Sequence, residues 1–417
     1  MGSPDGPPVT QADARAAAEA AARASYGRLV AFLAARSRDV AAAEDALADA
    51  FRAALESWPE RGVPARPEAW LLTAARRRLI DAARRGRVHD DAGATLALIA
   101  EEGRLDDSGG FPDERLKLLF VCAHPAIDRA ARAPLMLQTV LGLDAQRIAA
   151  AFVVAPATMS QRLVRAKTKI RDAGIAFAVP GRDELADRLD QVLEAIYAAY
   201  GAGWDDVAGA DPRRAGLADE ALWLGRLVAA LLPGEPEAKG LLALMLHCEA
   251  RRAARRGADG RFVPLSEQDP RTWSMPRIAE AEALLHDAVA LQRIGHFQLE
   301  AAIQSAHAER ARGRAVDWAA IARLYDGLAA LAPSIGALVG RAAAIAEAHG
   351  AEHGLAALDQ LAEAAVAAYQ PYWALRAHLL ARLGRPATAA FERAIGLSED
   401  AAVRAFLRAR ADAAAAS

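Results

Sequence analysis

The 417-residue sequence has only two cysteines, Cys122 and Cys248, and both lie in apolar stretches with helical spacing. This usage predicts buried free thiols and argues against a disulfide or a metal site. No apolar run approaches the roughly 18 residues that would indicate a membrane span. The opening MGSPDGPPVT lacks the basic and apolar regions of a signal peptide. We therefore expect a cytoplasmic protein with no membrane partner.

Runs of β-branched residues and the motifs of common catalytic sites are also missing. The chain has no Gly-rich phosphate loop, no HExxH, no GxSxG and no pairing of a nucleophile with a base. We therefore expect neither enzyme activity nor a cofactor. Alanine is abundant and apolar residues recur at intervals of three and four, so the predicted fold is all-α.

Positive and negative charges are nearly balanced, with 51 Lys and Arg against 53 Asp and Glu. Contact with nucleic acid therefore depends on local basic patches rather than on overall charge. The length suggests two or three domains. We divide the chain into a helical stretch at 11–88, a Gly-rich acidic linker at 89–112, a stretch with a basic helix pair at 113–180 and a long helical region at 181–417.

Residues 144–171 predict two short helices joined by a tight turn, the second of them strongly basic. Pro156 stands where the second helix should begin. Its buried stripe is predicted to contain Met159, Leu163, Ala166 and Ile170. The opposite face and its flanks would then carry Gln161, Arg162, Arg165, Lys167, Thr168, Lys169 and Arg171, as expected of a helix that enters the major groove of DNA. The alternative is an ordinary amphipathic helix with a solvated basic face.

Residues 70–87 form a second basic element with an inner apolar stripe, preceded by the Pro-rich stretch 58–69. The prolines and Gly62 predict a loop between Trp58 and Trp70. Such a loop is suited to holding an unpaired base. Alternatively, the tryptophans pack in the core and the arginines form a solvated face.

The order of these elements resembles a known family. Residues 26–85 (YGRLVAFLAARS to WLLTAARRRLIDAARR) resemble region 2 of the extracytoplasmic-function (ECF) sigma factors of the sigma-70 family. Residues 113–180, with RIAAAFVVAPATMSQRLVRAKTKIR, resemble region 4 of the members that have a long C-terminal helical extension. The resemblance implies a region 2 helical bundle, a region 4 helix-turn-helix and a helical extension.

For DNA, the resemblance implies that region 2 recognises and melts the −10 promoter element, and that region 4 reads the −35 element. The −10 residues would be Trp58, Trp70, Arg76, Arg77, Arg78, Arg84 and Arg85. The −35 residues would be Thr158, Ser160, Gln161, Arg162, Arg165, Lys167, Thr168 and Lys169, with Arg165 as the first choice for base readout. Many family members have Asn where this chain has Arg77, so the detail of recognition at that position does not carry over.

For protein partners, the resemblance implies binding to core RNA polymerase through its β′ clamp and β flap. The helix at 41–55 matches the clamp-binding segment, with Glu44, Asp45, Leu47, Asp49 and Phe51 as contact residues. The acidic linker occupies the place of the family segment that threads near the polymerase active centre, although a plain solvated linker fits equally well.

In the C-terminal half, 372–397 resembles a tetratricopeptide repeat (TPR), and 317–333 and 335–361 resemble degenerate helical hairpins of similar length. A long loop at 251–273 interrupts this pattern, and a similar loop occurs in the sigma factors with an extension. Either it contacts region 2, region 4 or polymerase, or it only caps the helical array. Its candidate regulatory residues are Asp259, Gly260, Arg261, Gln268, Asp269 and Trp273.

Three functions are compatible with the whole chain. The first is a transcription initiation factor that binds promoter DNA together with core RNA polymerase, its extension modulating activity in cis. The second is a stand-alone helix-turn-helix regulator with a helical sensor domain, and the third is a helical scaffold. The region 2 resemblance favours the first, and the sequence leaves open a small regulatory protein as a further partner.

Overall fold

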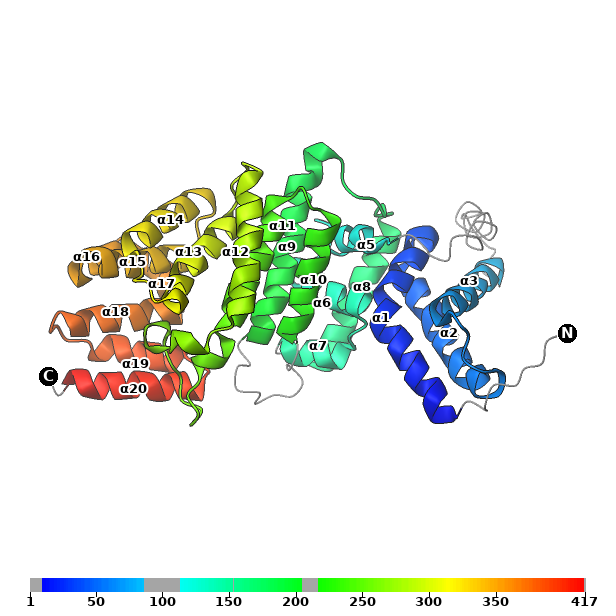
Figure 1. Ribbon diagram of the computed structural model, residues 1–417, viewed down its shortest axis with the longest axis horizontal. Helices are drawn as coiled ribbons and strands as arrows, with labels where there is room; N and C mark the ends of the chain where they lie inside the picture. Colours follow the sequence, from blue (N-terminus) through cyan, green and yellow to red (C-terminus); the bar gives the residue numbers. More distant parts are fainter. Residues whose placement is uncertain (1–9, 86–112, 153, 205–216, 416–417) are drawn as a thin grey trace. The chain divides into compact units, whose positions relative to one another are not determined.

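The computed structural model describes residues 10–85, 113–152, 154–204 and 217–415. The regular elements in these ranges are helices, apart from an isolated β-bridge between Arg256 and Phe262, and the all-α prediction is confirmed (Figure 1). The predicted linker 89–112 lies outside the described residues. No described helix is long and apolar enough to cross a membrane. The chain separates into two compact units, divided after Trp204 and again within α10 (Leu217–Leu231).

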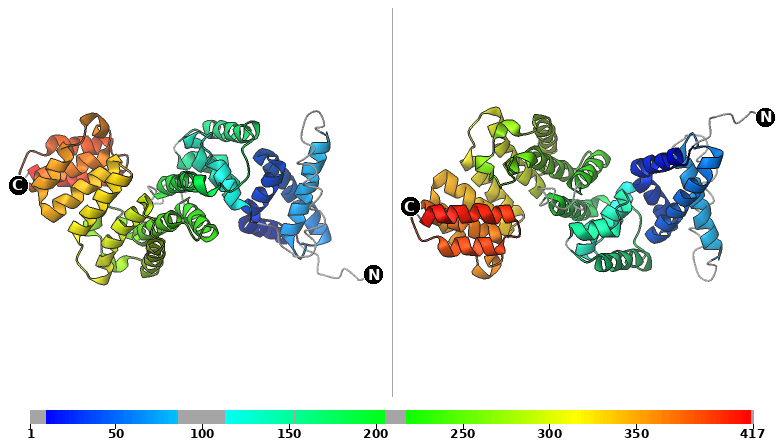
Figure 2. Two further views of the ribbon diagram at one scale, coloured as in Figure 1. Left: turned by 90° about the horizontal axis from the view of Figure 1, so that it is seen from above. Right: turned by 90° about the horizontal axis from the view of Figure 1, so that it is seen from below.

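Three helices form a bundle in the first unit (Figure 2): α1 (Gln11–Ser37), α2 (Val40–Arg61) and α3 (Pro67–Arg85). Thr10 caps α1 in a capping box, and the Asp39 carboxylate caps α2 by accepting a hydrogen bond from the Ala42 backbone N–H. Each large side chain in a core of this kind contributes about 1.5–3 kcal/mol by leaving water. Those at most 1% exposed include Leu29, Phe32, Leu33, Leu47, Trp58 and Leu71.

The first unit continues with α5 (Arg115–Cys122), α6 (Arg129–Leu141), α7 (Ala145–Ala151), α8 (Pro156–Asp172) and α9 (Arg182–Trp204). Helix α9 packs on α5 and α6. There the Arg188 guanidinium donates a hydrogen bond of 3.0 Å to the Phe120 carbonyl oxygen. The Arg132 guanidinium donates one of 3.2 Å to the Gln191 side-chain oxygen. Because of these contacts α9 belongs with the helices before it, and the unit division falls later than residue 181.

Helix α1 also packs directly on α5 and α6, so the bundle and the helices after it share one unit. The closest approach lies at Gly27, where a Cβ atom would stand 2.1 Å from the Val140 carbonyl oxygen. Gly142, at φ +70°, ends α6 and lies against the Tyr26 ring. Only a residue without a side chain allows the two backbones to approach this closely at position 27.

We therefore expect Gly27→Ala to destabilise the first unit by about 1–3 kcal/mol, because the added methyl group must displace backbone. Gly201→Ala is the matched control, since Gly201 lies in α9 and a Cβ atom added there would have no neighbour within 4 Å. It should leave stability unchanged or raise it by up to about 1 kcal/mol, because alanine favours the helix. Denaturant unfolding followed by circular dichroism measures both changes. Equal stability of the two variants would contradict the close approach of α1 and α6.

The second unit is a series of packed helices. They are, after α10, α11 (Pro236–Ala250), α12 (Met275–Ala290), α13 (His296–Ala308), α14 (Trp318–Leu331), α15 (Ile335–His349), α16 (Ala351–Asp359), α17 (Glu363–Val366), α18 (Gln370–Arg382), α19 (Thr388–Leu397) and α20 (Ala401–Ala415). Helix α11 packs on both α12 and α13 and is buried over its whole length. It is therefore the central helix of the unit's first part.

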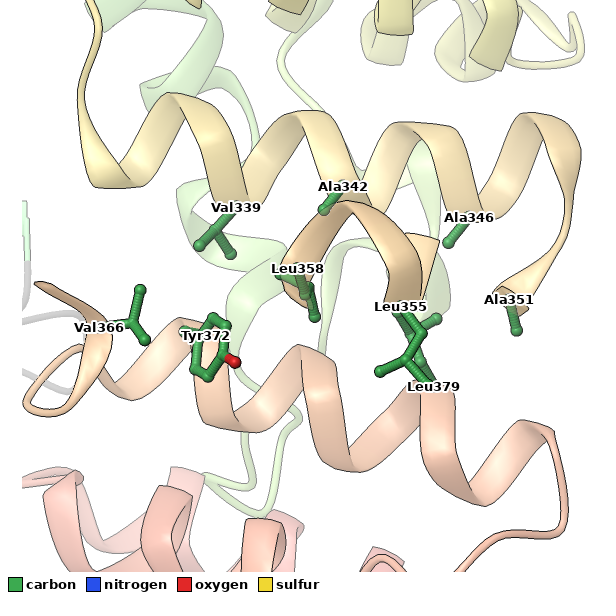
Figure 3. Packing of buried hydrophobic residues seen from close by; sticks show 9 residues of the cluster. All are labelled: Val339, Ala342, Ala346, Ala351, Leu355, Leu358, Val366, Tyr372 and Leu379. Atoms are coloured by element: carbon green, nitrogen blue, oxygen red, sulfur yellow. The ribbon is translucent and has the colours of Figure 1, made fainter. Parts of the chain in front are cut away.

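The later helices form hairpins at 335–361 (α15 and α16) and at 372–397 (α18 and α19), where the sequence pattern predicted them. The hairpin predicted at 317–333 was wrong, because this stretch is the single helix α14, which packs on α15. Figure 3 shows one shared core, in which side chains of α15, α16 and α18 meet. Leu358 and Leu379 are fully buried there, and Tyr372 and Val366 close one end. Each hairpin thus buries its apolar face against the next, as in repeat proteins.

Cys122 and Cys248 are buried and free, which confirms the sequence prediction. Burial raises the pKa of both thiols, that of Cys122 to about 12, so neither is a reactive thiolate at neutral pH. Within the described ranges, no group of three or more His, Cys, Asp and Glu side chains is arranged to hold a metal ion.

Two buried histidines make the second unit sensitive to acid. Burial, together with the positive charge of the nearby Arg251, lowers the pKa of His247 on α11 and of His307 on α13 to about 4. In the unfolded chain each takes up a proton near pH 6.5, so stability falls as pH drops from about 7 to 4. The loss amounts to ~3 kcal/mol per histidine.

We expect His247→Leu to flatten the pH dependence of the unfolding midpoint by about half. His286→Leu, which replaces an exposed histidine on α12, should leave the curve as in the parent protein. Thermal unfolding between pH 4 and pH 8 measures this. Parallel curves for His247→Leu and the parent would show that His247 is not the group that titrates.

Candidate nucleic-acid interface

Helices α7 and α8 are joined by a short turn at the place where the sequence predicts a helix-turn-helix. The turn between them is closed by backbone hydrogen bonds from Phe152 N–H to the Ile148 carbonyl oxygen and from Val154 N–H to that of Ala149, each 3.0 Å long. Helix α8 begins at Pro156, as predicted. Its buried residues are Met159, Leu163, Ala166 and Ile170, which confirms the predicted stripe.

The outward face of α8 is polar and basic. Thr158, Ser160, Gln161, Arg165 and Lys169 are exposed, whereas Arg162, Lys167 and Thr168 are half-buried. Sequence reasoning missed Val164, which is 62% exposed between the polar residues. An exposed apolar side chain on such a face can contact a thymine methyl group. The helical period places Val164 outside the buried stripe, so its exposure could have been predicted from the sequence.

A small cavity of about 320 Å³ lies between α8 and the start of α6. Arg162, Arg165 and Lys169 line one side of it, and Asp128, the N-cap of α6, lines the other. The Arg162 guanidinium donates to the Ala130 carbonyl oxygen at 3.3 Å, which fixes its direction. Three cations against the one Asp128 carboxylate give the lining a positive balance, which suits an anionic group such as a backbone phosphate.

Lys167 has a different environment from the other basic residues of α8. Its ammonium group pairs with the Glu44 carboxylate of α2, and the two side chains are only 13% and 12% exposed. Burial raises the pKa of Glu44, and Lys167 opposes that rise. Nearby, the Arg171 guanidinium lies 3.9 Å from the Asp39 carboxylate. A residue predicted to bind DNA and one predicted to bind polymerase therefore contact each other.

The other residues of α2 expected to bind polymerase are in varied positions. Leu47 is fully buried in the bundle, Asp45 is exposed, and the Asp49 carboxylate accepts a hydrogen bond from Arg52 at 2.8 Å. Phe51 lines a groove of about 770 Å³ between α1 and α2. Sequence reasoning missed Leu55, one turn further along the same groove and 44% exposed.

Near α3, the structure revises the predicted loop at 58–69. Helix α2 continues to Arg61, so the connection covers only residues 62–66. Trp58 is 1% exposed, and its ring lies edge-on to that of the half-buried Trp70, with centroids 5.6 Å apart. Trp58 is thus a core residue in this structure, whereas Trp70 reaches the surface.

The arginines of α3 do not share one environment. Arg76 is 7% exposed and lies in the bundle, whereas Arg77 and Arg78 are exposed. The side chains of Arg84 and Arg85 are outside the described part of the structure. Within the described part, Arg77, Arg78 and Trp70 form the accessible portion of the predicted −10 site.

Comparison with known proteins identifies the N-terminal bundle. Residues 22–88, which include most of α1 and all of α2 and α3, match the family described as Sigma-70 region 2. The bundle is thus similar to sigma-70 region 2, which supports membership of the sigma-70 family. Region 2 suggests a sigma-factor-like role in transcription initiation and implies binding to core RNA polymerase. This family consists of transcription factors that are not enzymes.

Two further comparisons extend beyond region 2. Residues 188–289 match a family of unknown function, DUF6596. The chain is also 38% identical over 384 residues to a protein of Rhizobium meliloti (strain 1021) named "Uncharacterized protein R00370", and the similarity covers 90% of each chain. No solved structure matches the chain.

The long loop at 251–273 lies in the second unit and has a buried and an exposed part. Gln268 and Trp273 are 3% and 5% exposed, and Trp273 packs with Ile278 and Ala308. Arg310 holds the loop by donating to the carbonyl oxygens of Leu265, Ser266 and Gln268. These contacts show that the buried part stabilises the fold.

The exposed part of the loop is a tight turn. Asp259, Gly260 and Arg261 form its tip, with Gly260 at φ +78°. Asp269 is also exposed, and its pairing with the Arg271 guanidinium lowers its pKa to about 2. The six residues predicted together are therefore separated into a buried pair and two exposed groups.

Proposed function

We propose that this chain is an ECF-type sigma factor that directs core RNA polymerase to a bipartite promoter. The observation that supports it is the presence, in one compact unit, of a region 2 match and a helix-turn-helix whose second helix exposes a polar, basic face. On this proposal α8 reads the −35 element as region 4, and α3 acts at the −10 element through Trp70, Arg77 and Arg78.

We propose the groove between α1 and α2 as the main polymerase contact, on the β′ clamp. Phe51 and Leu55 provide an apolar centre, and Gln11, Arg15 and Glu19 of α1 provide a polar edge. An apolar centre with a polar rim is typical of protein interfaces. The helices α5 to α8 would contact the β flap.

The basic surface of α8 is small, which favours a role that depends on polymerase. For a helix that makes about three phosphate contacts, log affinity for DNA falls with log salt concentration at a slope near −3. Such a helix binds DNA weakly at physiological salt. Stand-alone regulators usually gain affinity by dimerising over two half-sites. A polymerase that holds two DNA elements of the same promoter provides the missing affinity.

Reconstitution tests the proposal. Purified protein added to core RNA polymerase should start transcription at specific sites, and the protein alone should bind the same DNA poorly. Run-off transcription and a binding titration measure the two properties. Tight specific binding without polymerase, combined with no transcription in its presence, would instead support a stand-alone regulator.

We also propose that the C-terminal unit, with a TPR-like arrangement of hairpins, modulates activity in cis. Since both units belong to one chain, even a weak affinity between them or for polymerase acts at high effective concentration. A chain lacking residues 205–417 should give altered promoter output at equal protein concentration. Unchanged output would count against regulation by this unit.

A further inference from the structure

A large cavity lies in the second unit, between α18, α19 and α20 on one side and the end of the long loop on the other. Its volume is about 830 Å³, within the range of about 300–1,000 Å³ that is usual for small-molecule sites. The loop contributes Pro264, Ser266 and Glu267 to the lining. No part of the proposed sigma-factor function uses this cavity.

The floor of the cavity is apolar and well packed. Leu375, Phe391, Phe406 and Leu407 line it together with several alanines. Phe391 and Leu407 are only 4% and 5% exposed, so they are held by the core behind them. Such a floor is preformed for an apolar group.

The rim of the cavity is basic. Arg382, Arg385 and Arg410 line it, and Glu267 is the acidic side chain among the lining residues. Arg382 and Arg385 pair with glutamates of α15 and α16 that do not line the cavity, and Arg410 pairs with Glu267. A guanidinium has five N–H donors, so Arg382 and Arg385 can each bind a second anionic group while keeping the glutamate outside the cavity.

We infer that this cavity binds a small organic anion with an apolar body and a carboxylate or similar head group. The apolar floor takes the body, and the arginine rim takes the head group through charge-assisted hydrogen bonds. At Arg410 the bound head group competes with Glu267. The two side chains therefore have opposite effects: Arg410 strengthens anion binding and Glu267 weakens it.

The test uses the full chain and three probes with the same apolar tail, kept below their micellar concentrations: decanoate, decanol and decyltrimethylammonium. Isothermal titration calorimetry should show that decanoate binds about 10-fold or more tightly than the other two. Equal affinity for all three probes would overturn the inference. So would a preference for the cation.

Variants then locate the site. Arg410→Ala should lower the affinity for decanoate about 10-fold and leave the affinity for decanol unchanged. Glu267→Gln should instead raise the affinity for decanoate several-fold. Arg408→Ala, on the exposed side of the same helix, is the matched control and should change nothing. Opposite effects at positions 410 and 267 cannot result from a general loss of structure. Equal effects of Arg410→Ala and Arg408→Ala would overturn the assignment.

A blocking variant excludes other sites and other occupants. Ala411→Trp places a large side chain in the cavity and should abolish decanoate binding, whereas Ala409→Trp, outside the lining, should not. Thermal unfolding checks that both variants remain folded. Decanoate binding that survives Ala411→Trp, or self-association of the parent chain that this variant removes, would assign the cavity to another role.

Discussion

Replacing Arg165 by alanine should lower transcription from the promoter used by the reconstituted polymerase by roughly 5- to 150-fold. Arg165 is exposed on the side of α8 opposite the buried stripe. A bidentate contact between an arginine and a guanine contributes about 1–3 kcal/mol of discrimination, which corresponds to this range. Among the described residues, its side chain makes one hydrogen bond, a long one of 3.4 Å from Nε to the Gln161 carbonyl oxygen. Removing it should therefore leave the unfolding temperature unchanged.

Comparison with one further variant separates base reading from phosphate binding. Lys169→Ala should weaken binding to all promoter sequences to the same extent. It should also reduce the slope of log affinity against log salt concentration by about 1, as expected for a phosphate contact. Arg165→Ala should instead relax the preference at one base pair of the −35 element. Arg408→Ala, in the second unit, serves as a neutral control. An unchanged base preference in Arg165→Ala would exclude Arg165 as the reading residue.

The sequence predicted the local features of the fold well. The stripe from Met159 to Ile170 follows directly from the helical period, because each of these residues faces the same neighbouring helices. The hairpin formed by α18 and α19 follows from the same kind of pattern. In these segments, the apolar positions along one helix are enough to decide which face is buried.

Features that depend on tertiary packing were predicted less well. Pro59 suggested that α2 ends before it, but the helix tolerates this proline near its C-terminus and continues to Arg61. Trp58 consequently lies in the bundle, which is the alternative that the sequence left open. The pair between Glu44 and Lys167 joins residues 123 positions apart, and no periodicity within either helix signals it.

This pair leads to the second large expected effect. Lys167→Glu should destabilise the packing of α2 against α8 by about 3–5 kcal/mol, because it leaves two carboxylates together where both side chains are nearly buried. The bundle and the rest of α8 keep their own cores, so the expected result is separation of the two helices rather than general unfolding. Hydrogen exchange of the α2 and α8 backbone amides should increase selectively.

Exchanging the two charges provides the matched control. The double variant Glu44→Lys, Lys167→Glu restores an ion pair with the same groups in reversed positions. It should recover most of the lost protection, whereas Glu44→Lys alone should resemble Lys167→Glu. If the double variant is no better protected than either single variant, the pair does not hold α2 to α8.

On the proposed function, the same contact has a consequence for initiation. Glu44 is expected to face polymerase and Lys167 to face DNA, so neither is accessible until α2 and α8 separate. Glu44→Lys keeps every DNA-binding residue of α8 and removes the pair. Its binding to promoter DNA in the absence of polymerase should therefore be stronger than that of the parent chain, while the exchanged double variant binds like the parent or more weakly. Equal DNA binding by Glu44→Lys and the parent would mean that the contact does not limit access to α8.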